Sequence, residues 1–120
     1  MKETTLLLTN KYANFLPSSY QDIPSNLKLH KCFPYLVNSN RLIRFEIPKS
    51  KSFLNQKVRT TLTIYDVFRN IVTTLVNDKL KPGTYEILWN VANLTSGTYF
   101  YELTTDNERI THRIELLNNN

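Results

Sequence analysis

LKPGTYEILWNVANLTSGTYFYEL, residues 80–103, contains the strongest turn and strand signals of the chain. Pro82 fixes its own φ and Gly83 tolerates a positive φ, so the chain can reverse sharply before Thr84. The residues that follow alternate with the period of two that is typical of a β-strand, and one face carries Tyr85, Ile87 and Trp89. That face is predicted to point into a core.

A second turn and a second strand complete this stretch. Residues 93–97 hold the turn residues Ser96 and Gly97, and the strand that begins at Gly97 places on one face Tyr99, Tyr101 and Leu103. The two strands are expected to meet at this turn. A stacking platform for carbohydrate or bases is the alternative use of the aromatic residues, but the alternation favours a core for Tyr85, Trp89 and Tyr99. Phe100 points the other way and is the better candidate for an exposed contact.

The composition places the chain among ordinary globular proteins. It has 120 residues, of which 41% are hydrophobic and 21% charged, enough for one domain with a core. Seven Tyr and six Phe, together with many Thr and Ile, favour β-structure. The single cysteine, Cys32, excludes an intramolecular disulfide. We therefore expect an all-β fold without a covalent cross-link.

The same alternation recurs in residues 42–47, 58–65, 71–76 and 109–117. In the first of these segments one face carries Ile43, Phe45 and Ile47, and Pro48 is expected to end the strand. In the second, Leu62 and Ile64 are expected to point inward and Thr63 outward. Residues 66–70 should form the hairpin turn after it. These spacings predict an antiparallel β-sandwich of six or seven strands.

The front of the chain lacks a sustained period. Residues 1–26 are predicted to be a tether with a short strand over residues 5–9, and residues 27–120 to be the domain. The apolar run at residues 6–8 is too short for a secretory signal, and no run reaches the length of a transmembrane helix. We expect no signal peptide in this chain and no membrane insertion.

Four parts of the sequence carry a resemblance to a known family. They are KPGTYEILWN at 81–90, NLTSGTYFYEL at 93–103, YDVF at 65–68 and HRIELL at 112–117. These motifs resemble the C-terminal sorting domain of proteins exported by the type IX secretion system. The immunoglobulin-like domain of the flagellar hook-capping protein has a related form of the pattern. The resemblance implies an immunoglobulin-like β-sandwich that is not an enzyme.

The sequence departs from the family's pattern in three places. The family's opening run corresponds to residues 32–39, where only Pro34 and Asn38 match by identity. Arg69 stands where the family's turn has Gly, which would cost roughly 1 kcal/mol at positive φ unless Asn70 takes the left-handed position instead. The chain closes on three Asn residues, whereas the family commonly closes on a basic residue.

The resemblance also implies where a partner would bind. A C-terminal sorting signal is recognised by the secretion translocon, and the edge of the final strand with its nearby turns is the expected contact. The predicted recognition residues are Arg109, His112, Arg113, Glu115, Leu116 and Leu117. If the chain is part of a longer exported protein, it reaches the cell surface or the extracellular space through the periplasm. An assembly module that binds a protein through a sheet edge and a carbohydrate-binding module are the alternatives.

Residues able to perform covalent chemistry or to bind metal are sparse. His30 and Cys32 are two apart and could form half of a metal site, but no further ligands follow at a recognisable spacing, so an inert thiol is the preferred interpretation. His112 is interpreted as a packed or edge histidine. Three carboxylates lie in predicted turns: Asp66, Asp78 and Asp106. They are expected to accept hydrogen bonds from their own backbone, and a calcium site is the alternative. No catalysis, cofactor or small-molecule ligand is expected.

The net charge of +5 is unevenly placed. Nine bases lie between residues 28 and 69: Lys28, Lys31, Arg41, Arg44, Lys49, Lys51, Lys57, Arg59 and Arg69. Such a patch could meet nucleic acid or another anionic surface. No nucleic-acid motif accompanies it, so we interpret these bases as solvent-facing positions on alternating strands and expect no nucleic-acid partner.

Overall fold

The computed structural model describes residues 13–15, 24–34, 40–49 and 57–117. This part of the chain contains strands and no helix, which confirms the all-β prediction. The strands are β1 (Ala13–Phe15), β2 (Lys28–Leu29), β3 (Phe33–Pro34), β4 (Asn40–Ile47), β5 (Val58–Tyr65), β6 (Ile71–Leu80), β7 (Gly83–Asn90), β8 (Gly97–Thr104) and β9 (Arg109–Leu116).

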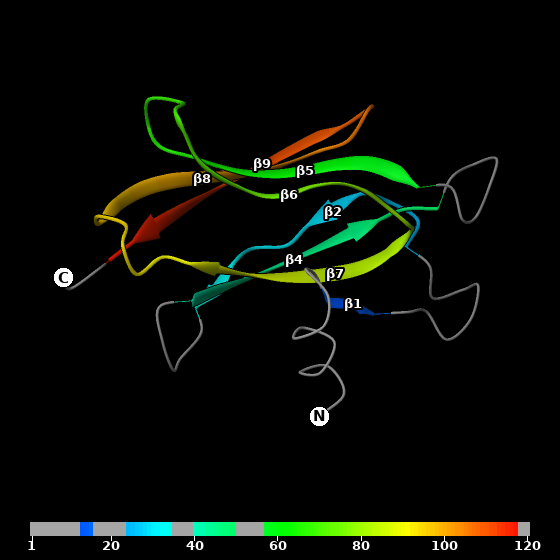
Figure 1. Cartoon of the computed structure of the whole chain (residues 1–120), viewed down its shortest axis with the longest axis horizontal. Coiled ribbons are helices and arrows are strands. Elements are labelled where there is room, and N and C mark those ends of the chain that lie inside the picture. Colours follow the sequence, from blue (N-terminus) through cyan, green and yellow to red (C-terminus); the bar gives the residue numbers. More distant parts are fainter. Residues whose placement is uncertain (1–12, 16–23, 35–39, 50–56, 118–120) are drawn as a thin grey trace.

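The strands form two antiparallel sheets that face each other as a β-sandwich (Figure 1). One sheet has the order β1-β7-β4-β2, with β3 also pairing with β4; the other has the order β6-β5-β8-β9. In the immunoglobulin plan, strands C, F and G pair in one sheet and strands B and E in the other. Here β5, β8 and β9 occupy the first set of positions and β4 and β7 the second, so the predicted immunoglobulin-like class is confirmed.

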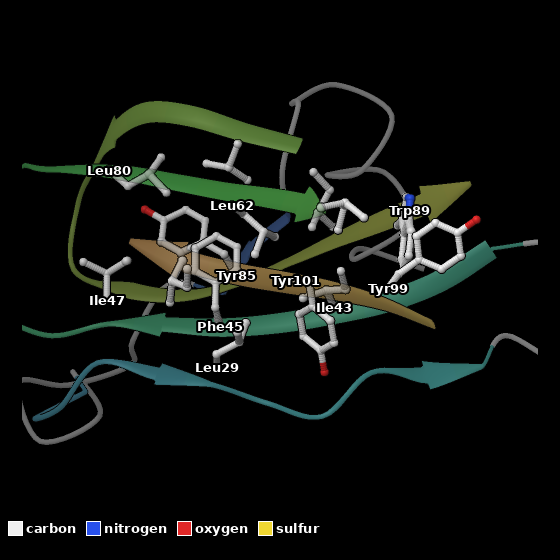
Figure 2. Packing of buried hydrophobic residues seen from close by; sticks show 14 of the residues in the cluster. Leu29, Ile43, Phe45, Ile47, Leu62, Leu80, Tyr85, Trp89, Tyr99 and Tyr101 are labelled. Atoms are coloured by element: carbon white, nitrogen blue, oxygen red, sulfur yellow. The ribbon is translucent and has the colours of Figure 1, made fainter. Parts of the chain in front are cut away.

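The core lies between the two sheets, where the alternating faces meet (Figure 2). Sequence periodicity predicted these faces correctly. The side chains of Ile43, Phe45 and Ile47 are wholly buried, and Tyr85, Trp89 and Tyr99 are 4%, 2% and 7% exposed. The Phe45 and Tyr85 rings stack with centroids 5.4 Å apart, and the Trp89 ring meets the Tyr99 ring edge-on. The aromatic residues of the 80–103 stretch therefore fill the sandwich.

The two strands of that stretch meet at the turn over residues 91–96, as predicted, but they do not pair with each other. β7 pairs with β4 and β1, whereas β8 pairs with β5 and β9, so the turn between them carries the chain from one sheet to the other. Residues 81–82 make a crossing of the same kind from β6 to β7. Periodicity identifies strands, but it does not say which sheet each one joins.

Both crossings are built in the same way. Each ends in Gly-Thr-Tyr, with Gly83 at φ 152° and Gly97 at φ 150°. The hydroxyl of Tyr85 donates to the carbonyl four residues earlier, and so does the hydroxyl of Tyr99, each at 2.8 Å. A tyrosine that bonds back across the turn into its own strand is a hallmark of immunoglobulin-like folds. We call each of these units a tyrosine clamp.

Strand β6 is longer than predicted. It runs through Leu80 instead of ending at residue 76, so Asp78 lies within a strand, and its prediction as a turn residue was wrong. The pairing with β5 shifts register twice, which leaves Val72 and Leu75 as extra residues that pack partly against the core. Such β-bulges let a long strand follow a twisted neighbour, and they break the simple alternation that sequence reading depends on.

The predicted tether contributes to the fold. Its residues 13–15 form β1, which pairs with β7. The strand expected over residues 5–9 lies outside the described residues, as do residues 35–39 of the family's opening run.

Candidate functional site

Strand β9, where recognition was predicted, is the last strand of its sheet. Its exposed side chains all lie on the outer face and are those of Arg109, Thr111, Arg113 and Glu115. The side chains of His112 and Leu116 point the other way, toward the sandwich interior. Leu117 follows the end of the strand and is 83% exposed. The six predicted recognition residues are therefore divided between two faces.

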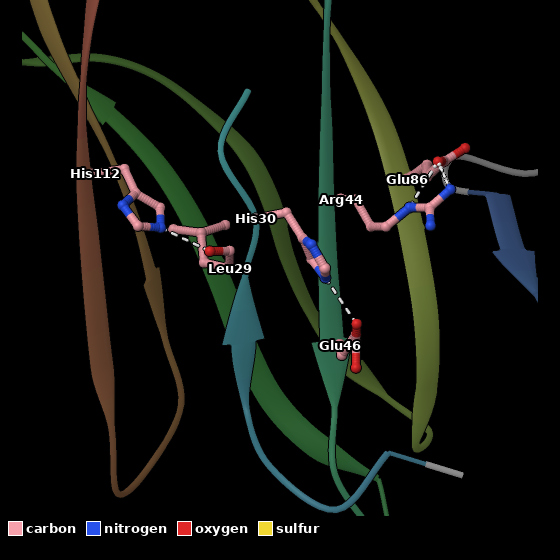
Figure 3. A network of polar contacts seen from close by, with 6 residues as sticks. All are labelled: Leu29, His30, Arg44, Glu46, Glu86 and His112. Atoms are coloured by element: carbon pink, nitrogen blue, oxygen red, sulfur yellow. Dashed lines mark hydrogen bonds and ion pairs between the residues drawn. The ribbon is translucent and has the colours of Figure 1, made fainter. Parts of the chain in front are cut away.

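The inward residues hold β9 in place. His112 contacts β2 through a 2.6 Å hydrogen bond between its Nε2 and the Leu29 carbonyl (Figure 3). The centroid of its ring lies 5.5 Å from that of Tyr101. Leu116 is 4% exposed and belongs to the core. These contacts engage His112 and Leu116 in packing, so the outward residues are the ones that a partner can reach.

A buried carboxylate organises the outer face of this sheet. Glu102 on β8 is 5% exposed, although it points away from the core. Its Oε2 accepts a 2.8 Å hydrogen bond from Thr111 and lies 3.7 Å from the Arg109 guanidinium, and Arg69 approaches its other oxygen at 3.9 Å. Thr63, its neighbour on β5, faces outward as predicted but is buried in this cluster. Side chains from the hairpin turn and from β9 thus meet over β8.

Next to this cluster, Arg113 and Glu115 form an exposed ion pair at 2.7 Å. The Thr98 hydroxyl also donates to Glu115, at 2.8 Å. The hydrogen bond from Arg113, and then the one from Thr98, hold the pKa of the Glu115 carboxyl below its usual range. Glu115 therefore stays ionised and bound to its neighbours, which leaves β9 with a fixed arrangement of charge.

The β5–β6 hairpin turn has a positive φ at the position where the family has Gly. The residue with positive φ is Arg69, at 67°, so the relief expected from Asn70 does not occur. The Asp66 carboxylate accepts hydrogen bonds from the backbone N–H groups of Phe68 and Asn70, both at 2.9 Å, which confirms its predicted capping role. The Arg69 guanidinium lies 4.2 Å from the centroid of the Tyr65 ring. These contacts hold Arg69 in a strained conformation.

The same end of the outer face presents apolar side chains. Four residues that are direct neighbours across all four strands of this sheet form one row, which we call the aromatic row: Ile71, Tyr65, Phe100 and Arg113. At the hairpin turn Val67 is 54% exposed and Phe68 is 79% exposed. A groove of about 430 Å³ separates this turn from residues 93–99. Of these residues, sequence analysis singled out only Phe100 and Arg113 as contact residues.

The outer face of the other sheet carries separate polar pairs. His30 bonds to Glu46 at 2.7 Å, and the Arg44 Nε donates to Glu86 at 2.9 Å (Figure 3). Arg44 and Arg59 thus lie on opposite faces of the sandwich, which separates the bases that cluster in the sequence. Among the described residues no three side chains of His, Cys, Asp or Glu are grouped as metal ligands.

Cys32 is the last residue of the connection from β2 to β3. Its backbone N–H donates to the Tyr101 hydroxyl at 2.7 Å, and the hydroxyl in turn donates to the His30 carbonyl at 3.0 Å. Burial raises the pKa of the Cys32 thiol to about 11, against a smaller opposing effect of Arg41. Burial likewise raises the pKa of Tyr101 to about 12. At neutral pH both groups are uncharged and serve packing.

The fold and the outward edge strand define a β-sandwich domain whose accessible chemistry is suited to protein contact. Residues 37–116, about two thirds of the chain, match the secretion system C-terminal sorting domain, and the chain belongs to this family. The family is the C-terminal sorting signal of type IX secretion, which directs proteins to the cell surface or the extracellular space. No curated protein matches the sequence at a significant level. In the described residues there is no helix that could cross a membrane.

Proposed function

We propose that this domain acts as a non-catalytic handle that the type IX secretion machinery binds through strand β9 and the turns beside it. The observation that carries the proposal is the position of β9. It ends its sheet, and it presents alternating charged side chains outward while its inward side chains fasten it to β2 and the core. An edge strand offers backbone groups for strand addition, and its outward side chains provide specificity.

The charges of β9 suit recognition by a protein surface. Arg109 and Arg113 are 67% and 68% exposed at the side chain, and each is held by a carboxylate of its own sheet. Side chains that are already ordered lose less conformational entropy when a partner binds. The strand therefore presents a preorganised pattern that a translocon can distinguish from the edges of unrelated sandwiches.

The test is secretion of a passenger protein. The full chain is fused behind a signal peptide and a folded reporter, and it is expressed in a bacterium that has a type IX secretion system. The reporter is expected in the medium or at the cell surface, and in the periplasm when the translocon gene is deleted. A second control carries the signal peptide and the reporter without the chain. Periplasmic retention of the complete fusion in the competent strain would overturn the proposed function.

A further inference from the structure

The end of the sandwich beside the β5–β6 hairpin turn is unusually apolar. Among the described residues, the exposed large hydrophobic side chains are those of Val67, Phe68, Ile71 and Leu117. All four lie at the same end, because Tyr65 pairs with Phe100 near the start of β8 and Leu116 pairs with Gly97. Figure 1 shows the hairpin turn and the end of β9 on this side. Exposed apolar groups that cluster in this way mark interaction surfaces.

The hairpin turn is held rigidly. The Asp66 carboxylate binds two backbone N–H groups of the turn, and the Asp66 N–H donates to the Asn70 carbonyl at 3.0 Å. Arg69 keeps a conformation that costs an L-residue free energy, and its guanidinium covers the ring of Tyr65. A turn built in this way holds the backbone at Phe68, so less backbone entropy is lost when a partner covers it.

Two exposed bases flank the apolar surface, and the three carboxylates beside it already have partners. Arg69 and Arg113 flank it with side chains that are 57% and 68% exposed. The Asp66 carboxylate accepts hydrogen bonds from the turn backbone, and Glu102 is buried. The Glu115 carboxylate accepts hydrogen bonds from Arg113 and Thr98. A complementary partner therefore supplies carboxylates around an apolar contact. Tyr and Arg are among the residues that dominate binding energy at protein interfaces, and Phe is enriched in such interfaces.

We propose that the hairpin turn and the aromatic row form the docking surface for a protein of the export machinery, which contributes an apolar protrusion rimmed by Asp and Glu side chains. The inference rests on the proposed function and places the main contact beside β9, at Phe68, Ile71 and Phe100. A carbohydrate ligand is less suited to this surface, because the Arg69 guanidinium already occupies a face of the Tyr65 ring on which a sugar would stack.

The test uses the secretion assay with single variants of the full chain. Phe68→Ser removes the aromatic side chain that is most exposed among the described residues, and Arg113→Glu reverses one flanking charge. Each is expected to lower the secreted fraction about tenfold, the effect of losing one well-placed interface residue. Arg44→Glu is the matched charge control, because Arg44 also pairs with a glutamate on an outer strand face but lies on the other sheet. Leu88→Ser is the apolar control on that sheet.

The possible results separate the two proposals. Thermal unfolding of each purified variant must first give the same midpoint as the unchanged chain. If the unchanged fusion is secreted and Phe68→Ser and Arg113→Glu are secreted equally well, the docking surface is wrong while the export function stands. If the unchanged fusion stays in the periplasm, the export function fails and the docking inference fails with it. Loss of secretion in Arg44→Glu and Leu88→Ser as well would also overturn the assignment to this surface.

Two further measurements test the occupant. Sedimentation of the purified chain distinguishes a partner protein from a second copy: a dimer that Phe68→Ser converts to a monomer would overturn the proposal. Binding to a panel of polysaccharides, measured by calorimetry, would overturn it if Phe68→Ser abolished the heat. A monomeric chain that releases no heat with the panel, and whose secretion depends on Phe68 and Arg113, is the result we expect.

Discussion

Arg69 occupies a backbone position that favours glycine. An L-residue in the left-handed region loses roughly 1 kcal/mol or more through contact of its Cβ with the backbone. Replacing Arg69 by Ala keeps this cost and removes the contacts with Tyr65 and Glu102, whereas Gly removes the cost as well. We therefore expect Arg69→Gly to be more stable than Arg69→Ala by about 1 kcal/mol, the reverse of their order at ordinary strand positions. Urea denaturation of both variants measures the difference, and a more stable Ala variant would contradict the assigned φ.

Cys32 provides a single reporter of burial, since the chain has no other cysteine. Its pKa of about 11, raised from 9.0 by burial, leaves about a hundredfold less thiolate at pH 8 than an ordinary thiol has. Alkylation by iodoacetamide at pH 8 is expected to be slower by about that factor in the folded chain than in urea. Mass spectrometry of the modified fraction over time gives both rates, and equal rates would contradict the burial.

The same shift sets a direction for stability with pH. Between about pH 9 and 11 the unfolded chain releases the Cys32 proton while the folded chain retains it. The folded state then binds more protons, so the contribution of this group to stability is fully present below pH 9 and declines as the pH rises toward 11. Cys32→Ala should remove this part of the alkaline dependence.

Among the strands, β2 depends on side chains from the opposite sheet. The Tyr101 hydroxyl accepts from the Cys32 N–H and donates to the His30 carbonyl, and His112 bonds to the Leu29 carbonyl. These contacts close the open side of the sandwich between β2 and β9. The ladder of this two-residue strand with β4 is short, so these side-chain hydrogen bonds add to it, together with the burial of Leu27 and Leu29.

Removal of the Tyr101 hydroxyl should loosen β2. Tyr101→Phe deletes two hydrogen bonds to buried or half-buried backbone, which corresponds to about 1–3 kcal/mol of stability, and should speed amide hydrogen exchange in residues 27–34. Tyr85→Phe is the control, because its hydroxyl bonds to Lys81 in a crossing that does not involve β2. Hydrogen exchange read by mass spectrometry compares the two variants. Equal exchange in residues 27–34 would show that Tyr101 does not hold this strand.

The strands were predictable because their signals are local. The period of two along residues 42–47, 58–65 and 84–90 gave both the strand and the buried face. The end of β6 was missed because two bulges shift its alternation, and Asn77 and Asp78 look like turn residues in isolation. Sheet membership was missed because it depends on partners far away in the sequence.

The candidate site was predictable only in part for the same reason. The outward residues of β9 follow from its alternation, and the capping role of Asp66 follows from its position in a turn. The burial of Glu102 depends on Arg69, 33 positions earlier, and on Arg109 and Thr111 in the next strand. An acidic residue inside the aromatic sequence TYFYEL was the one available signal, because a lone carboxylate in a central strand requires partners.

Taken over all strands, the contacts that close the sandwich are distant in sequence. The His112–Leu29 bond spans 83 positions and the Tyr101–His30 bond spans 71. Chains dominated by such contacts fold slowly, because loop closure precedes the gain from packing. Refolding is therefore expected in the range of milliseconds to seconds. Stopped-flow mixing that follows the fluorescence of Trp89, 2% exposed in the folded chain, measures the rate; completion within microseconds would contradict it.

The two tyrosine clamps have a consequence for how the chain finds its topology. A strand that leaves one layer can turn back beside its predecessor or pass over to the opposite layer, and a wrong choice must be undone before packing can finish. Each clamp closes over only four positions, from Tyr85 to Lys81 and from Tyr99 to Thr95, so it can form before any sheet is complete. Each five-residue unit thus favours the crossing locally, while pairing with β4 and β5 decides the sheet that β7 and β8 join.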